Sequence, residues 1–300
     1  MNIVIMGAGA IGSLFGALLS KNNNVLLICR KPHASAIKKS GLYIQGKTRL
    51  NVKINALTSV DNVKFFPELL ILTVKSYDTG SAILQAKKII NKDTIVLSLQ
   101  NGLDNIDKIK KYLNPEKIIA GVTTQGAFFS KPGVIKYTGN GTTLLGELNG
   151  YKTKRVINIE NTFNSAGIKT KTSENILKEL WFKAIINSSI NPLTVLFNCK
   201  NGYLLENPIL ENILERICKE STCIANAIGL EITDISMIKK TKDVVKDTSE
   251  NHSSMLQSFL RGKKTEIDSI NGKLVEIGKK YGLKPSMNEI MVYSIKSLVK

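Results

Sequence analysis

The chain has 300 residues, of which 43% are hydrophobic, so it can bury the core of one large or two ordinary domains, and disorder is excluded as its main state. Its formal net charge is +18, yet only five of its 42 basic residues are arginine, and the lysines are spread without a dense block. Because nucleic-acid recognition usually draws on arginine forks, this distribution argues against a nucleic-acid-binding protein.

Two further features of composition bear on where the protein works. The first twenty residues carry no charge, but they lack a basic leader and four glycines interrupt them, so we expect neither a signal peptide nor a membrane anchor. The four cysteines form no CxxC pair, and two histidines are too few for a zinc-type cluster. We therefore expect a soluble, cytoplasmic protein without a metal site.

Short apolar runs alternate with helical stretches through the first half of the chain. This alternation predicts βαβ units around a parallel sheet. In chain order we expect a strand in NIVIMGAG, a helix over 11–19, a strand in NVLLICR, a helix over 34–40, a strand in LLILTVKS, a helix over 81–90 and a strand in TIVLSLQNG. A further strand in KIIAGVTTQGAF and antiparallel hairpin strands in PGVIKYTGNGTTLLGEL extend the sheet.

The second half of the chain reads as helical. Helices are predicted over 173–198, 207–228 and 265–281, with Ser173, Asn207 and Thr265 as caps and Pro208 at a first helical position. We expect an α/β protein, with a Rossmann-type doubly wound parallel sheet in an N-terminal domain (1–168) and an all-helical C-terminal domain (169–300).

A glycine-rich turn, GAGAIG, follows the first predicted strand and precedes the first predicted helix. Gly7 permits the tight turn, Gly9 lets the backbone approach a pyrophosphate, and Gly12 allows close packing of helix and strand. The pyrophosphate would lie at the positive end of the helix dipole, against Ala10 and Ile11. This context predicts a dinucleotide site.

The ends of the next strands carry basic and amide side chains. Where an NAD enzyme would have an acid for the ribose 2′-hydroxyl, the sequence has Arg30 and Lys31, which favours the 2′-phosphate of NADP unless both are ordinary surface residues. Lys75 and Asn101 end the following strands and so face the ligand edge of such a sheet, although a lysine is also a common strand boundary.

The stretch LWFKAIINSSINPLT, residues 180–194, has the apolar spacing of an amphipathic helix. Lys183, Asn187 and Asn191 are spaced four apart and fall within about 80° of each other on one face. Asparagine is a mediocre helix former, so the row is either a solvated face or a set of hydrogen-bonding groups aimed at a polar ligand.

With these motifs, nearly the whole chain resembles the ketopantoate reductase (2-dehydropantoate 2-reductase) family. The resemblance rests on GAGAIGSLFG, Arg30, TVKS, LQNG, LWFKAIINSSINPLTVLFNCKNG, SSMLQ and TEIDSINGKL. It implies a two-domain enzyme that reduces 2-dehydropantoate to (R)-pantoate with NADPH, on the route to pantothenate and coenzyme A.

The resemblance also implies roles for individual residues. Lys183 is then the catalytic lysine and Glu266 the substrate-binding acid of the catalytic pair, although an acid in a first helical turn is also favoured by the helix dipole alone. Asn187, Asn191 and Ser254 then bind substrate, with Ser253 as an adjacent alternative, and Lys75 and Asn101 lie by the nicotinamide and substrate.

Other interpretations stay open at this point. A related NADP-dependent reductase of another branched 2-oxo acid would share the fold and the fingerprint. A non-catalytic NADPH sensor is a second alternative. The family includes different assembly states, so a homodimer remains an open expectation.

Overall fold

The computed structural model describes residues 1–298, and its contacts divide the chain into two compact units. Unit 1 holds Met1–Gln100 and Asn105–Glu179, and unit 2 holds Asn101–Asp104 and the chain from Leu180 onward. Unit 1 continues past residue 168, where we expected the first domain to end, because strand β12 (Thr170–Thr172) pairs with strand β11 (Thr143–Glu147) in the same sheet. Among residues 1–298, no helix combines the length and the apolarity that crossing a bilayer requires.

Unit 1 is built on a large sheet that, within the described residues, has eight strands in the order β12-β11-β8-β7-β6-β1-β2-β5. Its other strands are β1 (Asn2–Met6), β2 (Asn24–Ile28), β5 (Asn55–Leu57), β6 (Leu69–Leu72), β7 (Ile95–Ser98) and β8 (Ile118–Thr123). Neighbours are parallel throughout, except that β11 runs antiparallel to β8. From β5 to β8 this is the 3-2-1-4-5-6 order of a doubly wound dinucleotide-binding sheet, which confirms the expected fold class.

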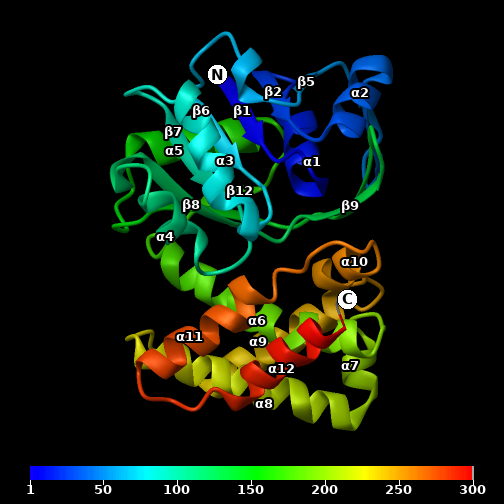
Figure 1. Cartoon of the computed structure of the whole chain (residues 1–300), viewed down its shortest axis with the longest axis vertical. Coiled ribbons are helices and arrows are strands. Elements are labelled where there is room, and N and C mark those ends of the chain that lie inside the picture. Colours follow the sequence, from blue (N-terminus) through cyan, green and yellow to red (C-terminus); the bar gives the residue numbers. More distant parts are fainter. Residues whose placement is uncertain (299–300) are drawn as a thin grey trace. The chain divides into compact units, whose positions relative to one another are not determined.

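Helices cover this sheet, as Figure 1 shows. Because both faces are covered, the inner strands are continuous apolar runs, and Ile3 and Ile5 are fully buried. Phe15 and Phe163 meet edge to face on one side of the sheet, with ring centroids 5.7 Å apart. The helices are α1 (Ala10–Leu19), α2 (Lys31–Ser40), α3 (Thr79–Ala86), α4 (Asn105–Lys110) and α5 (Lys154–Ser165).

A second, smaller sheet of unit 1 packs against α1. Its strands, in the order β4-β3-β10-β9, are β3 (Leu42–Gly46), β4 (Leu50–Val52), β9 (Gly126–Lys131) and β10 (Val134–Gly139). The single strand expected in KIIAGVTTQGAF is therefore wrong, because β8 ends at Thr123 and β9 begins in the other sheet. The buried Gln125 turns the chain between them, since its amide oxygen accepts from the Tyr137 hydroxyl at 2.7 Å and from the Gly141 N–H at 3.2 Å.

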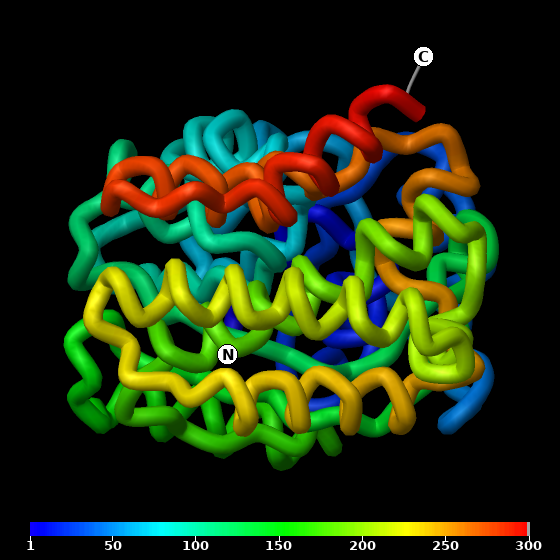
Figure 2. Tube along the Cα trace, turned by 90° about the horizontal axis from the view of Figure 1, so that it is seen from below, coloured from blue at the N-terminus to red at the C-terminus, as the bar shows by residue number. Residues whose placement is uncertain are grey.

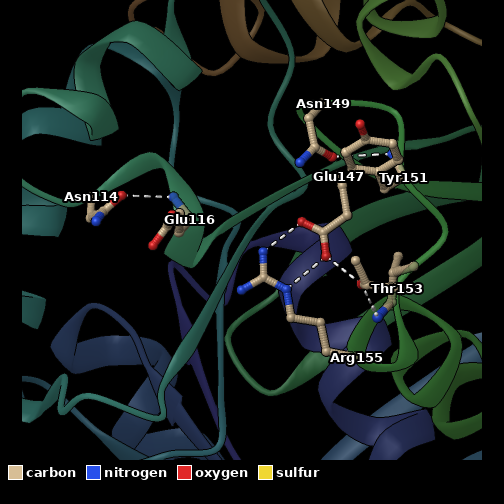
Figure 3. A network of polar contacts seen from close by, with 8 residues as sticks. Asn114, Glu116, Glu147, Asn149, Tyr151, Thr153 and Arg155 are labelled. Atoms are coloured by element: carbon tan, nitrogen blue, oxygen red, sulfur yellow. Dashed lines mark hydrogen bonds and ion pairs between the residues drawn. The ribbon is translucent and has the colours of Figure 1, made fainter.

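A buried carboxylate joins the end of β11 to the start of α5, as Figure 3 shows. Arg155 donates from Nε and Nη2 to the two oxygens of Glu147, at 2.7 and 2.5 Å. The Thr153 hydroxyl, which caps α5, donates to the same carboxylate at 2.6 Å. These hydrogen bonds raise the pKa of Arg155, and they satisfy a carboxylate that is only 4% exposed.

Replacing Glu147 by alanine should lower the free energy of unfolding by about 2 kcal/mol, measured by chemical denaturation. The reason is that Arg155 would lose its bidentate partner. The loss of stability is smaller than for a fully buried ion pair, because the Arg155 side chain is 31% exposed and water screens its charge. Asp61→Ala is the matched control, because it breaks the exposed pair with Lys88 and should leave stability nearly unchanged. Equal denaturation midpoints for wild type and Glu147→Ala would contradict a stabilising role for the Glu147–Arg155 ion pair.

Unit 2 is helical, and α8 packs against α9, α11 and α12. Figure 2 shows α8 and α9 side by side and antiparallel. Asn207 caps α8 with its side-chain oxygen and Pro208 stands in the first turn, so both predictions for this helix are confirmed. The helices are α6 (Ile176–Leu196), whose first turn is counted with unit 1, α7 (Tyr203–Glu206), α8 (Pro208–Ala227), α9 (Asp234–Asp247), α10 (Ser254–Phe259), α11 (Lys273–Lys280) and α12 (Ser286–Ser297).

Two predicted helix starts are wrong. Helix α6 begins at Ile176 because the Asn175 side chain, and not that of Ser173, accepts from the Lys178 N–H at 3.0 Å. The helix expected over 265–281 begins with a π-helical segment, Asp268–Gly272, and continues as α11.

Helix α6 runs through a proline without ending. Pro192 has no N–H, so the carbonyl of Ser188 loses its intrahelical donor. The Asn271 side chain, in the π-helical segment, donates to that carbonyl at 3.1 Å and to Asn288 Oδ1 at 3.0 Å. The part of α6 that carries the predicted site is thereby fixed to the segment that follows Glu266.

Candidate active site

The glycine loop after β1 has the geometry that its spacing predicts. Gly7 has φ +92°, and a Cβ there would lie 2.6 Å from the Val74 backbone nitrogen; at Gly12 a Cβ would collide with the Thr73 side chain. These two glycines are required by the fold itself. At Gly9, by contrast, a Cβ would meet nothing nearer than the Gly7 oxygen at 3.8 Å. The missing side chain at Gly9 therefore leaves open a path to the backbone, which suits an approaching phosphate.

The start of α1 has the character of an anion site. Gly9 is the N-cap and offers no side-chain acceptor, and the first turn contains no acid. The first N–H groups of a helix, here those of Ala10 and Ile11, have no intrahelical acceptor and lie at the positive end of the dipole. The residues present thus fit the pyrophosphate of a dinucleotide.

Three neighbouring strands bring the predicted cofactor residues to one edge of the sheet. Strand β1 lies between β2 and β6, so Gly7, Arg30 and Lys75, which follow these strands, share their carboxyl-end edge. Arg30 is exposed, and no acid stands between β2 and α2. This edge fits a nucleotide that carries an additional phosphate on its ribose.

In unit 2, α6 carries the lysine and asparagine row on one face, as predicted. Lys183 and Asn187 are half-buried, and Asn191 is only 4% exposed. Burial lowers the pKa of Lys183 to about 8, and the negative charge of Glu266 opposes that shift. Within the part of the chain that the structure describes, Asn191 Nδ2 is buried without a hydrogen-bond partner. A buried donor of this kind is costly unless a ligand uses it, which argues against a merely solvated face.

Glu266 lies two residues before the π-helical segment and not inside a first helical turn as expected. Glu266 is only 6% exposed, and its backbone oxygen accepts from the Ser269 N–H at 3.1 Å. The segment Asn101–Asp104 packs on the same turn, because the Leu103 N–H donates to the Ser269 oxygen at 3.1 Å and the Ser269 hydroxyl donates to Asp104 at 3.1 Å. The structure thus groups Asn101 with unit 2 and with the turn that bears Glu266.

The two adjacent serines have different surroundings. Ser253 is buried, caps α10 by accepting from the Leu256 N–H at 3.1 Å, and shares a 2.7 Å hydrogen bond with the Thr194 hydroxyl. Thr194 in turn donates to the Asn191 backbone oxygen at 2.8 Å. Ser254 is exposed, so its hydroxyl is the one accessible from solvent, whereas Ser253 anchors the start of α10 to α6.

Sequence reasoning did not single out Asn201. This residue is 7% exposed, its Nδ2 donates to Thr248 Oγ1 at 2.9 Å, and its Oδ1 has no hydrogen-bond partner among the described residues. Asn201 belongs to the NCKNG stretch after α6, but a buried amide on a loop has no periodic signal. We add it to the candidate polar groups of unit 2.

Comparisons with known proteins bear on both units. The family model described as ketopantoate reductase PanE/ApbA matches residues 3–150, and the model of its C-terminal part matches residues 175–299. A 2-dehydropantoate 2-reductase from Pyrococcus abyssi is 45% identical over 292 residues, which are 97% of this chain and 95% of the relative.

Solved structures match over the same length. A PanE/ApbA family ketopantoate reductase from Ralstonia eutropha has a TM-score of 0.91 and 29% identity, over 99% of this chain and 98% of that one. A D-mandelate dehydrogenase in complex with NADH and anilino(oxo)acetate has a TM-score of 0.95 and 27% identity, again over 99% and 98%.

Proposed function

The chain belongs to the ketopantoate reductase family of oxidoreductases, and from this premise we propose that it reduces 2-dehydropantoate to (R)-pantoate with NADPH. The observation that carries the proposal is the α6 row, where a half-buried lysine of lowered pKa stands in line with a buried asparagine whose amide nitrogen has no partner among residues 1–298. The activity would serve pantothenate and coenzyme A biosynthesis in the cytoplasm.

The residues of unit 1 would hold the nucleotide. The open backbone at Gly9 and the N–H groups of Ala10 and Ile11 would bind the pyrophosphate, and Arg30 would pair with the 2′-phosphate. Lys75, at the same strand edge, would lie by the nicotinamide. When bound, the reduced nicotinamide supplies the hydride.

Lys183 would complete the reduction. Addition of a hydride to the C2 ketone carbon leaves an alkoxide, which needs stabilising charge and then a proton. The Lys183 ammonium can supply both, and a pKa near 8 makes it a better proton donor at neutral pH than an ordinary lysine of pKa about 10.4. Glu266 would keep the lysine charged and accept from a substrate hydroxyl.

The uncharged groups would orient the substrate. Asn187 and Asn191 would donate to its hydroxyl and carboxylate oxygens, and Ser254 would bind the carboxylate. Asn101, in the segment that packs on the turn bearing Glu266, would contact the substrate. Such neutral donors position an anion without shifting the charge balance on which Lys183 depends.

Turnover in the reductive direction should fall as the pH rises through about 8, because the acid form of Lys183 is present below its pKa and is lost above it. The measurement is kcat/KM for 2-dehydropantoate from neutral to alkaline pH. Glu266→Gln removes the charge that raises the Lys183 pKa, so the alkaline limb should move to lower pH. A profile that stays flat well above pH 8 would exclude this lysine as the acid.

The function itself is tested by following NADPH oxidation with 2-dehydropantoate, beside NADH and beside 2-oxoisovalerate. Fast turnover with 2-dehydropantoate and NADPH alone is the expected result. If a nucleotide binds but no substrate is turned over, the proposed cofactor site stands. The search then moves to another substrate or to a sensor function.

A second candidate has a specific observation in its favour. The D-mandelate dehydrogenase that matches this chain is a complex with NADH and an oxoacetate compound. A reductase of another 2-oxo acid is therefore the alternative, and preference for an aromatic 2-oxo acid in the same assay would favour it.

A further inference from the structure

A buried histidine of unit 1 connects a distant hairpin to the glycine loop. His33, in α2, is 4% exposed, and both of its ring nitrogens are used. Nδ1 lies 2.9 Å from the Gly133 backbone nitrogen, in the turn between β9 and β10, and Nε2 lies 2.9 Å from the Ser13 hydroxyl in α1. Neither contact belongs to the nucleotide or substrate groups described above.

The direction of these hydrogen bonds follows from their chemistry. A backbone N–H can only donate, so Nδ1 accepts from Gly133 and the ring proton is on Nε2. Nε2 therefore donates to Ser13 Oγ, and the Ser13 hydroxyl donates to the Ala8 carbonyl at 3.1 Å. Burial lowers the pKa of His33 to about 4, so the ring is neutral at neutral pH, as this sequence of bonds requires.

The last bond in the series ends on the loop itself. Ala8 lies between Gly7 and Gly9, and its carbonyl belongs to the peptide plane that leads into Gly9, the N-cap of α1. The N–H groups of Gly7 and Ala8 both donate to the Ile28 carbonyl at 3.0 Å, which fixes the other side of the loop. Ser13 thus orients the peptide through which the backbone would meet a phosphate.

A role in core packing alone does not explain why a histidine stands at position 33. Burying a ring with two polar nitrogens carries a desolvation cost that a leucine or phenylalanine of similar size would avoid. The Phe129 ring, with its centroid 4.8 Å from that of His33, already supplies apolar packing at this place. What the histidine adds is a hydrogen bond at each ring nitrogen, and through Ser13 these hydrogen bonds fix the Ala8 carbonyl.

We propose that His33 is a positioning residue for the nucleotide, which through Ser13 holds the Gly7–Gly9 loop in its phosphate-binding conformation; the inference rests on the proposed NADPH site. Preorganisation of this kind acts on cofactor affinity and not on the chemical step. Its effect should therefore separate from kcat.

The test compares His33→Leu, His33→Gln and Ser13→Ala by direct NADPH titration, thermal melting and steady-state kinetics. We expect His33→Leu and Ser13→Ala to raise Kd for NADPH roughly tenfold, with kcat at saturating NADPH near that of wild type. His33→Gln should recover most of the affinity, because its amide can accept from Gly133 and donate to Ser13. The double variant His33→Leu/Ser13→Ala should lose no more affinity than either single change.

Ile37→Val is the matched control, because it lies in the same helix, is 2% exposed and lowers stability without touching the hydrogen-bond series. Unchanged NADPH affinity in Ser13→Ala and His33→Leu, with only the melting temperature altered, would overturn the inference and leave the proposed function standing. A wild-type protein that binds neither NADPH nor NADH would overturn both. If His33→Leu does not fold, Ser13→Ala decides, because it removes the hydroxyl that donates to the Ala8 carbonyl.

Discussion

Replacing Lys183 by alanine should reduce kcat for 2-dehydropantoate by roughly 100-fold or more, the usual size of general acid catalysis, and leave Kd for NADPH nearly unchanged. The lysine is half-buried on α6, in unit 2, whereas the glycine loop and Arg30 belong to unit 1. Steady-state assays at saturating NADPH give kcat, and a fluorescence titration gives Kd.

Two further variants separate the roles of this lysine. Lys183→Arg keeps the positive charge but has a pKa too high to give up a proton, so it should remain slow if proton transfer limits the reaction. Lys219→Ala removes an exposed lysine of α8 and should have wild-type turnover. Normal turnover of Lys183→Ala would remove this lysine from the mechanism.

Replacing Arg30 by aspartate should weaken NADPH binding by roughly 100-fold and leave NADH binding unchanged or improved. The proposed charge-assisted hydrogen bond to the 2′-phosphate would be lost, and a carboxylate would stand where it repels that phosphate but can accept from a ribose hydroxyl. Arg30 caps α2 through its backbone and its side chain is exposed, so the fold should tolerate the change.

The control for Arg30 is Lys38→Asp, which makes the same change of charge in the last turn of the same helix. It should leave the ratio of the two nucleotide affinities as it is in wild type. An equal loss for NADPH and NADH in Arg30→Asp would reject the 2′-phosphate assignment.

Sequence patterns predicted correctly those strands and helices that are determined by residues close together in the chain. The first strand, glycine loop and helix α1 follow from an apolar run and three glycine positions, and Asn207 with Pro208 marks the start of α8. The switch of sheets after Thr123 escaped prediction, because both strands are apolar and only the distant partners of Gln125 decide where the chain turns.

The same distinction holds for the candidate site. Helical spacing was enough to align Lys183 with Asn187 and Asn191. The pKa of Lys183, however, is lowered by burial and partly held up by the charge of Glu266, and the linear pattern shows neither effect. The partnerless Asn201 oxygen is equally invisible in a sequence. Likewise the use of both nitrogens of His33 depends on Gly133, which is 100 residues away.

The proline in α6 has a consequence for how the chain matures. The donor that serves the Ser188 carbonyl comes from Asn271, 83 residues later in the chain. During synthesis, the Ser188 carbonyl lacks this donor until residue 271 has been added. The helix that carries Lys183 therefore reaches its final hydrogen bonding only after residue 271 has been added to the chain.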